Sequence, residues 1–381
     1  MFTRILHASA NSFFLFGPRG TGKSTWLRQQ FPNARWYDLL DTGECLRLSR
    51  EPGVLYREAQ ALSPGSWVVM DEVQKVPQVL NEVHRLIEER KLRFVLSGSS
   101  ARKLRRGGTN LLAGRAQVEH LFPLVSDEVA YDLPLPEILI RGTLPMTIGT
   151  SKPNAYLTSY AHTYIQEEVR AEALTRNIGG FSRFLEIAAR QNGQVTNVSG
   201  IARDAAVSRQ TVQNYFDIMV DTLLGQWLQP WKLKRATKQV AHPKFFLFDC
   251  GVARALSGRL PYPPTSEELG PLLETWLLGE LMAHIAYRQL GYTLHFWRSP
   301  DGVEVDFLCE TAKGYTAIEV KAAAHWDSRY LRGLTRISEE LGSRKVTRYG
   351  VFLGSRVANW DGVLVLPVLD FLRRLWHGDI L

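Results

Sequence analysis

Residues 13–24 read FFLFGPRGTGKS and join four apolar residues to a complete G-x-x-x-x-G-K-S pattern. The apolar run is typical of a buried strand, and residues 24–30 are compatible with a helix. A strand, a glycine-rich loop and a helix N-terminus in this order form a cradle of backbone N–H groups that suits phosphate. The segment therefore predicts a binding site for a nucleoside triphosphate.

Individual residues of this loop have predicted roles. Lys23 is expected to reach the outer phosphates, and the Ser24 hydroxyl to ligate magnesium at the helix N-terminus. The predicted nucleotide-binding residues are Gly17, Pro18, Arg19, Gly20, Thr21, Gly22, Lys23, Ser24 and Thr25. An ordinary glycine turn would match the same pattern, but the flanking strand and helix favour the phosphate-binding loop.

An acidic pair ends a second apolar run, Trp67-Val-Val-Met70. We expect Asp71 to hold magnesium. Glu72 is expected to orient and deprotonate the attacking water, which hydrolysis requires and transfer to a substrate hydroxyl does not. The alternative is a strand that leads into a helix, whose first turn favours acidic residues.

Small hydroxyl residues end a third apolar strand, predicted over residues 92–96. Ser97 is the first candidate for a sensor of the γ-phosphate, and Ser99 is the second. Serines at a strand end are also common turn formers, so this prediction depends on the two neighbouring motifs.

Together the three strand ends resemble the AAA+ branch of phosphate-loop ATPases, in which the sensor strand lies between the two motif strands. The resemblance implies ATP and Mg²⁺ as cofactors and a homo-oligomer, with a hexamer as one candidate. It also implies an arginine that completes the site of the neighbouring subunit. Arg115, at the end of the basic segment 102–115, is our candidate, and a solvated basic loop is the alternative.

The composition is that of an ordinary folded protein, with 45% apolar and 22% charged residues in 381. The net charge of +8 favours a polyanionic partner such as DNA, and the sequence names no protein partner. Three widely spaced cysteines fit a reducing compartment. No signal peptide and no membrane-spanning run is found, so we expect a cytoplasmic protein without a membrane partner.

The motifs and proline-rich breaks predict three domains: residues 1–150, 151–240 and 241–381. In the middle domain, residues 199–215 resemble the helix-turn-helix of the winged-helix family. The predicted DNA-contacting residues are Arg209, Gln210, Gln213 and Asn214 on the second helix, and Lys232, Lys234 and Arg235 in the wing. The alternative is a lid or protein-docking module with the same core.

In the third domain, alternation puts Glu304 and Asp306 on one face of a strand, and Glu319 and Lys321 on one face of the next. Two acids and a lysine suit metal-dependent phosphodiester cleavage. The arrangement resembles the PD-(D/E)xK superfamily, with a restriction-endonuclease fold. That resemblance implies a metal site at Asp306 and Glu319, with Lys321 and the helical acid Glu274. A cross-strand salt bridge, or a domain that binds without cutting, is the alternative.

The whole order of motifs resembles a widespread group of archaeal and bacterial AAA+ ATPases whose C-terminal domain has no assigned function. The predicted fold class is α/β, with a phosphate-loop AAA+ domain, a winged helix-turn-helix and an endonuclease-like domain. The predicted function is ATP hydrolysis coupled to remodelling of DNA or translocation on it, with branched DNA as a candidate substrate. The alternatives are an ATP-gated nuclease of defence or repair and a nucleotide-controlled protein-binding switch.

Overall fold

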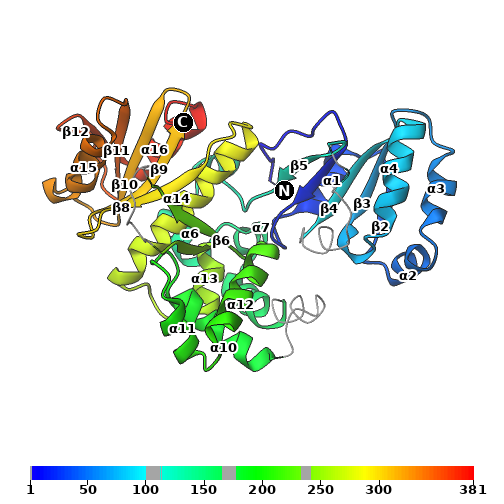
Figure 1. Cartoon of the computed structure of the whole chain (residues 1–381), viewed down its shortest axis with the longest axis horizontal. Coiled ribbons are helices and arrows are strands. Elements are labelled where there is room, and N and C mark those ends of the chain that lie inside the picture. The colour runs from blue at the N-terminus through cyan, green and yellow to red at the C-terminus, as the bar shows by residue number, and fades with distance from the viewer. Residues whose placement is uncertain (1, 100–111, 113, 165–176, 233–241) are drawn as a thin grey trace. The chain divides into compact units, whose positions relative to one another are not determined.

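The computed structural model describes residues 2–99, 112, 114–164, 177–232 and 242–381 (Figure 1). The chain forms two compact units, Met1–Pro123 with Asp221–Leu224, and Leu124–Val220 with Gly225–Leu381. The predicted boundaries near residues 150 and 240 both fall inside the second unit. The division into three domains therefore stays a prediction. No helix among the described residues combines the length and apolar character that crossing a membrane requires.

The described part of the first unit contains a five-stranded sheet of order β2-β3-β4-β1-β5. Its strands are β1 Phe13–Phe16, β2 Arg35–Asp38, β3 Trp67–Asp71, β4 Arg93–Gly98 and β5 Gln117–His120. Each pairing is parallel, so the carboxyl ends of the strands meet at one edge. Strand β4 lies between β1 and β3, which confirms the predicted place of the sensor strand.

Helices pack the apolar strands of this sheet into a core. They are α1 Lys23–Gln30, α2 Thr42–Arg50, α3 Gly53–Ala59 and α4 Val79–Arg90. Helix α4 buries Val79, Val83 and Leu86, which are spaced to form one apolar face. In Figure 1, α2, α3 and α4 lie together beside the strands. This packing fixes the positions of the strand ends that carry the predicted motifs.

The described part of the second unit contains an eight-stranded mixed sheet of order β12-β13-β11-β10-β9-β8-β6-β7. Its strands are β6 Gly225–Pro230, β7 Lys244–Leu247, β8 Leu294–Arg298, β9 Glu304–Thr311, β10 Gly314–Lys321, β11 Val346–Phe352, β12 Ala358–Trp360 and β13 Val363–Pro367. Strands β6 and β7 pair antiparallel and also extend the sheet through β8. Strand β6 lies in the predicted middle domain and β7 in the predicted third, and both belong to this one sheet.

Helices of the second unit pack on this sheet and span the residues predicted as a helix-turn-helix. They are α6 Leu135–Arg141, α7 Pro145–Gly149, α8 Pro153–Ser159, α10 Ile178–Arg190, α11 Val198–Asp204, α12 Arg209–Asp221, α13 Cys250–Leu256, α14 Ser266–Tyr287, α15 Arg332–Leu341 and α16 Val368–His377. Helix α14 begins at a capping box formed by Thr265 and Glu268.

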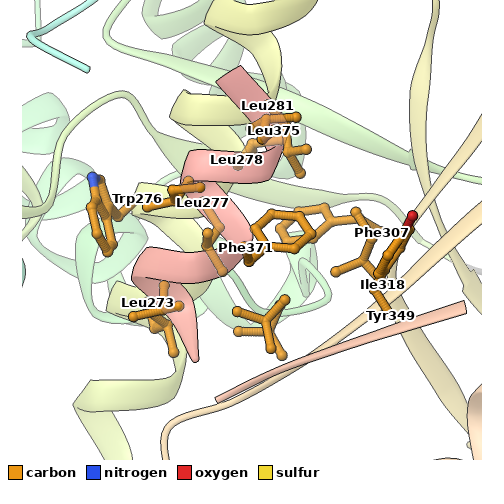
Figure 2. Close-up of a cluster of buried hydrophobic side chains, with 14 of the residues drawn as sticks. Leu273, Trp276, Leu277, Leu278, Leu281, Phe307, Ile318, Tyr349, Phe371 and Leu375 are labelled. Carbon is orange, nitrogen blue, oxygen red and sulfur yellow. The ribbon is translucent and has the colours of Figure 1, made fainter. Parts of the chain in front are cut away.

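The main core of the second unit forms where α14, α16 and the sheet meet. Figure 2 shows Leu277 and Leu281 of α14 near Phe371 and Leu375 of α16. Phe307, Ile318 and Tyr349 supply the strand side of the same cluster (Figure 2). The same packing positions Glu274, the acid predicted on this helix.

We expect Leu277→Ala to lower the free energy of unfolding of the second unit by about 2–5 kcal/mol, because the fully buried side chain would leave a cavity. Val357→Ala is the matched control, since that side chain is 48% exposed and its truncation should change stability by less than about 0.5 kcal/mol. Denaturant unfolding of both variants measures the difference. Equal shifts for the two variants would contradict the assigned core.

Candidate nucleotide site and carboxylate cluster

The phosphate-binding loop connects β1 to the N-terminus of α1. Gly20 and Gly22 have φ values of 82° and 90°, which side-chain-bearing residues rarely adopt. A Cβ atom at Gly17 would lie 2.3 Å from the carbonyl oxygen of Leu121, so only glycine fits there. No side chain caps the start of α1, and its first turn holds no acidic residue. The N-terminal N–H groups of α1 therefore suit an anion.

Lys23 lies buried inside this loop. Its Nζ atom donates to the carbonyl oxygens of Gly17 at 2.7 Å and Pro18 at 3.2 Å. Arg4 also stabilises the loop, because its guanidinium donates a hydrogen bond to the carbonyl oxygen of Thr21 at 2.9 Å. The same guanidinium donates to the carbonyl oxygen of Phe122, which follows β5. Lys23 is thus positioned at the loop, where phosphate oxygens would offer it stronger acceptors than neutral carbonyl groups.

Asp71 joins the three predicted motifs at the carboxyl edge of the sheet. Its carboxylate is 3% exposed and accepts a hydrogen bond from the Ser24 hydroxyl at 2.6 Å. The fully buried Ser97 hydroxyl donates to the other carboxylate oxygen. The Ser24 hydroxyl at the start of α1 and the Asp71 carboxylate at the end of β3 supply oxygen ligands of the kind that Mg²⁺ prefers. These two residues therefore fit the predicted ion.

Glu72 follows Asp71 in a left-handed backbone conformation, with φ at 59°. Such a conformation costs free energy in a residue other than glycine and occurs often at functional sites. Gln74 donates through Nε2 to the Glu72 carboxylate and, at 3.3 Å, to the Ser99 hydroxyl. Gln74 is buried, and its Oε1 atom has no hydrogen-bond partner among the described residues.

Gln74 therefore links the expected water-activating residue Glu72 to the sensor strand. Gln74 is not among the site residues predicted from the sequence. The short distance from Glu72 was an available signal, but a glutamine in a short turn has no distinctive pattern. Ser99 contacts Gln74, whereas Ser97 contacts Asp71, so the two candidate sensors have different neighbours.

Arg115 lies at the opposite edge of the sheet from the phosphate-binding loop. It precedes β5, whose first residue Gln117 pairs in parallel with Phe13 at the start of β1. Its guanidinium forms an ion pair with Glu88, and its side chain is 37% exposed. Arg115 therefore cannot reach the nucleotide of its own chain across the sheet. A role at the site of a second chain stays a prediction.

The helix-turn-helix residues have the expected exposure. Ser208 accepts a hydrogen bond from the Thr211 N–H at 3.0 Å and so caps α12. Tyr215 and Phe216 of α12 pack against the aromatic residues of α10, with Phe184 and Phe216 ring centroids 4.9 Å apart. Among the predicted DNA-contacting residues, these have exposed side chains: Arg209, Gln210, Gln213, Asn214 and Lys232. Lys234 and Arg235 lie outside the described residues, and the winged-helix assignment stays a prediction.

Four carboxylates from α14 and the β9–β10 pair form a cluster, which we call the carboxylate cluster: Glu274, Glu304, Asp306 and Glu319. The antiparallel register pairs Phe307 with Ile318, which brings Asp306 and Glu319 to adjacent positions on neighbouring strands. The structure thus brings together the residues that the sequence singled out.

Lys321 is bound inside this cluster. Its Nζ lies 2.5 Å from Glu319 and 3.7 Å from Asp306. The same Asp306 oxygen, Oδ2, accepts a hydrogen bond from the backbone N–H of Val320 at 2.8 Å.

A second lysine, Lys244 of β7, enters the carboxylate cluster, and no sequence pattern singles it out. Its Nζ atom lies 3.2 Å from Glu274 and 3.9 Å from Asp306, and it forms an ion pair with Glu304. Within the described residues, no group of three or more His, Cys, Asp or Glu side chains is arranged to hold a metal ion. The cluster as arranged around Lys244 therefore does not fit the divalent ion that the nuclease resemblance implies.

Burial and neighbouring charges both shift the pKa values of this cluster. Burial raises the pKa of Glu274 to about 7, and the nearby Asp306 carboxylate adds to this effect. Burial and Asp306 also raise the pKa of Glu319 well above its ordinary value. Burial acts to lower the pKa of Lys244, but the surrounding carboxylates outweigh it, so that pKa lies above its ordinary value.

Comparisons with known proteins support the class of the first unit. Residues 9–130 match the family model of an AAA domain, which together with the loop geometry supports an AAA+ ATPase domain. Residues 134–262 and 269–371 match two domains of unknown function, DUF8612 and DUF4143. These matches leave the roles of the helix-turn-helix and of the carboxylate cluster open.

Two curated relatives are the uncharacterized proteins Rv2008c of Mycobacterium tuberculosis and Mb2031c of Mycobacterium bovis. Each is 27% identical over 331 residues, covering 84% of this chain and 71% of the relative. Among solved structures, the Aeropyrum pernix ORC1 protein in complex with DNA matches 65% of this chain and 86% of its own at 13% identity and a TM-score of 0.26. Protein VC1899 from Vibrio cholerae matches 97% of each chain at 11% identity and a TM-score of 0.23. Structural similarities this low inform neither fold nor function.

We expect Gln74→Leu to lower kcat for ATP hydrolysis about tenfold and to leave KM nearly unchanged, because the loss of a hydrogen bond that positions Glu72 is worth on the order of 1 kcal/mol. Gln78→Leu, an exposed position a few residues later, is the matched control and should leave both constants unchanged. Steady-state kinetics measures both variants. A large rise in KM for Gln74→Leu would instead assign the residue to the shape of the loop.

Proposed function

We propose that this protein hydrolyses ATP in its first unit and couples that reaction to remodelling of DNA or translocation on it. The observation that carries the ATPase part is the buried Asp71 carboxylate, which accepts hydrogen bonds from Ser24 of the phosphate-binding loop and Ser97 of the adjacent strand. The AAA domain match over residues 9–130 supports the same class of activity.

Each residue of the nucleotide site has a role in this mechanism. The loop N–H groups and Lys23 bind the phosphate oxygens and hold the γ-phosphate in place. Ser24 and Asp71 would hold Mg²⁺, which would offset negative charge on the phosphates. Glu72 orients the attacking water and accepts its proton, and Ser97 is the candidate sensor of the γ-phosphate, next to Asp71.

Arg115 supplies positive charge to the site of a neighbouring chain in this proposal. Its place at the far edge of the sheet excludes a role at its own nucleotide, so any role in hydrolysis requires a second chain. An arginine beside the γ-phosphate would stabilise the charge that develops in the transition state. The proposal therefore includes a homo-oligomer, and the ion pair with Glu88 would have to open when the chains assemble.

The DNA part of the proposal rests on charge and exposure. The net charge of +8 favours association with a polyanion. Arg209, Gln210 and Gln213 lie exposed in the first two turns of α12, where a recognition helix contacts DNA edges and phosphates. A nucleotide-controlled protein-binding switch is the second candidate, because the same exposed face would suit a protein partner.

We expect the rate of ATP hydrolysis by the full chain to rise at least severalfold when the form of DNA that it binds is added. Single-stranded, duplex and branched DNA are tested in turn. Glu72→Gln should lower the rate at least a hundredfold, because it removes the proton acceptor. Any activity left in that variant identifies contaminating ATPases.

Arg209→Ala should weaken DNA binding and reduce the salt dependence of DNA affinity by about one phosphate contact. Arg190→Ala is the matched control and should change neither, because this exposed arginine is paired with Glu186 on α10.

Phosphate release and filter binding measure these effects. Hydrolysis that no DNA form changes, together with no DNA binding at low salt, would exclude the DNA proposal. That result would favour the protein-binding switch.

Mixing two inactive chains tests the proposed role of Arg115. Lys23→Ala removes a chain's own nucleotide site, and Arg115→Ala removes the group that it would lend. We expect each variant alone to lose at least tenfold in hydrolysis, and the mixture to recover part of the rate, because some interfaces pair an intact loop with an intact arginine. Lys23→Ala mixed with Glu72→Gln is the control and should recover nothing. No recovery with Arg115→Ala would assign the interchain role to another residue.

A further inference from the structure

The carboxylate cluster of the second unit holds a buried ammonium group where the nuclease resemblance implies a metal ion. Lys244 is 4% exposed and lies on β7, far in sequence from the acids that it contacts. Its backbone pairs with Leu228 of β6 and forms a bridge with Val195, so the strand that carries it is fixed on both sides. The side chain is therefore directed into the cluster by the sheet itself.

The ammonium of Lys244 contacts acids from two different elements. Glu274 comes from α14, whereas Glu304 and Asp306 come from β9. The Phe296 ring also faces the ammonium group, with its centroid 5.5 Å from Nζ of Lys244. A divalent cation bound between α14 and β9 would need these same carboxylate oxygens. Lys244 and a metal ion therefore compete for one position.

The charges of the cluster show what would happen without Lys244. Four carboxyl groups face two lysine side chains, so the acids of the cluster outnumber its ammonium groups. Arg298 reaches Glu304 at 3.7 Å and offsets part of the excess. The Oε2 atom of Glu319 is buried and has no hydrogen-bond partner among the described residues. Removing one ammonium would leave buried carboxylates that require another cation or protons.

We propose that the Lys244 ammonium is a built-in cation that closes the carboxylate cluster to divalent metal, and that its removal opens the cluster as a divalent-cation site. Two consequences follow for the natural chain. It binds no Mg²⁺ or Mn²⁺ at this cluster, and it does not cleave DNA there, because no cation is available to activate water. The inference concerns the second unit and does not depend on ATP hydrolysis.

Mn²⁺ binding to the full chain without nucleotide tests this inference, with free Mn²⁺ measured by electron paramagnetic resonance. We expect Lys244→Met to bind one Mn²⁺ per chain more than the natural protein. The double variant with Asp306→Asn should lose that additional ion. Lys313→Met, the same change at an exposed site in the β9–β10 turn, is the matched control and should bind no additional ion.

Two results would overturn the inference. One is a Mn²⁺ ion in the natural protein that Asp306→Asn alone removes, or DNA cleavage with Mn²⁺ that the same substitution abolishes. The other is a folded Lys244→Met chain, judged by circular dichroism and thermal unfolding, that binds no additional ion. If Lys244→Met does not fold, Lys244→Gln replaces it, and the comparison of the natural protein with Asp306→Asn still decides whether the cluster is closed.

Discussion

The parallel pairing of β1, β4 and β3 is the constraint on which the nucleotide site depends. It brings the carboxyl ends of three strands to one edge, where the Asp71 carboxylate accepts hydrogen bonds from Ser24 and Ser97. A carboxylate that is 3% exposed would be costly to bury without such partners. The same hydrogen bonds that make this burial tolerable therefore assemble the loop, the acidic strand and the sensor strand into one site.

The second unit meets the same requirement with charged partners. Lys244 and Lys321 place ammonium groups among four carboxylates, and the network connects β7, β9, β10 and α14. Breaking one member of a buried ion-pair network leaves an uncompensated charge, which is strongly destabilising. The cluster is thus a structural link between the sheet and α14 as well as a candidate site, and the raised pKa of Glu274 reflects how little water reaches it.

Local pattern predicted much of both sites, because their residues are close in sequence or follow strand periodicity. The spacing of the phosphate-binding loop, the acidic pair at the end of β3 and the alternation of Glu304 and Asp306 all belong to single elements. Gln74 and Lys244 were missed for different reasons. Gln74 lies in a short 3₁₀ turn without a pattern, and Lys244 reaches its partners only through the pairing of β7 with β6 and of β6 with β8. Such long-range register is not encoded in any local window.

The two acidic sites differ in the partners that their carboxylates have, and this difference separates their chemistry. Asp71 is satisfied by neutral hydroxyl groups, so its negative charge stays available to a divalent cation that arrives with nucleotide. In the carboxylate cluster the partners include two lysine ammonium groups, which already balance part of the negative charge, and Lys244 lies between α14 and β9. Similar acids in both units thus favour metal-assisted hydrolysis in the first and a closed ionic network in the second. A resemblance based on the acids alone would not distinguish these cases, because the deciding residue is the lysine.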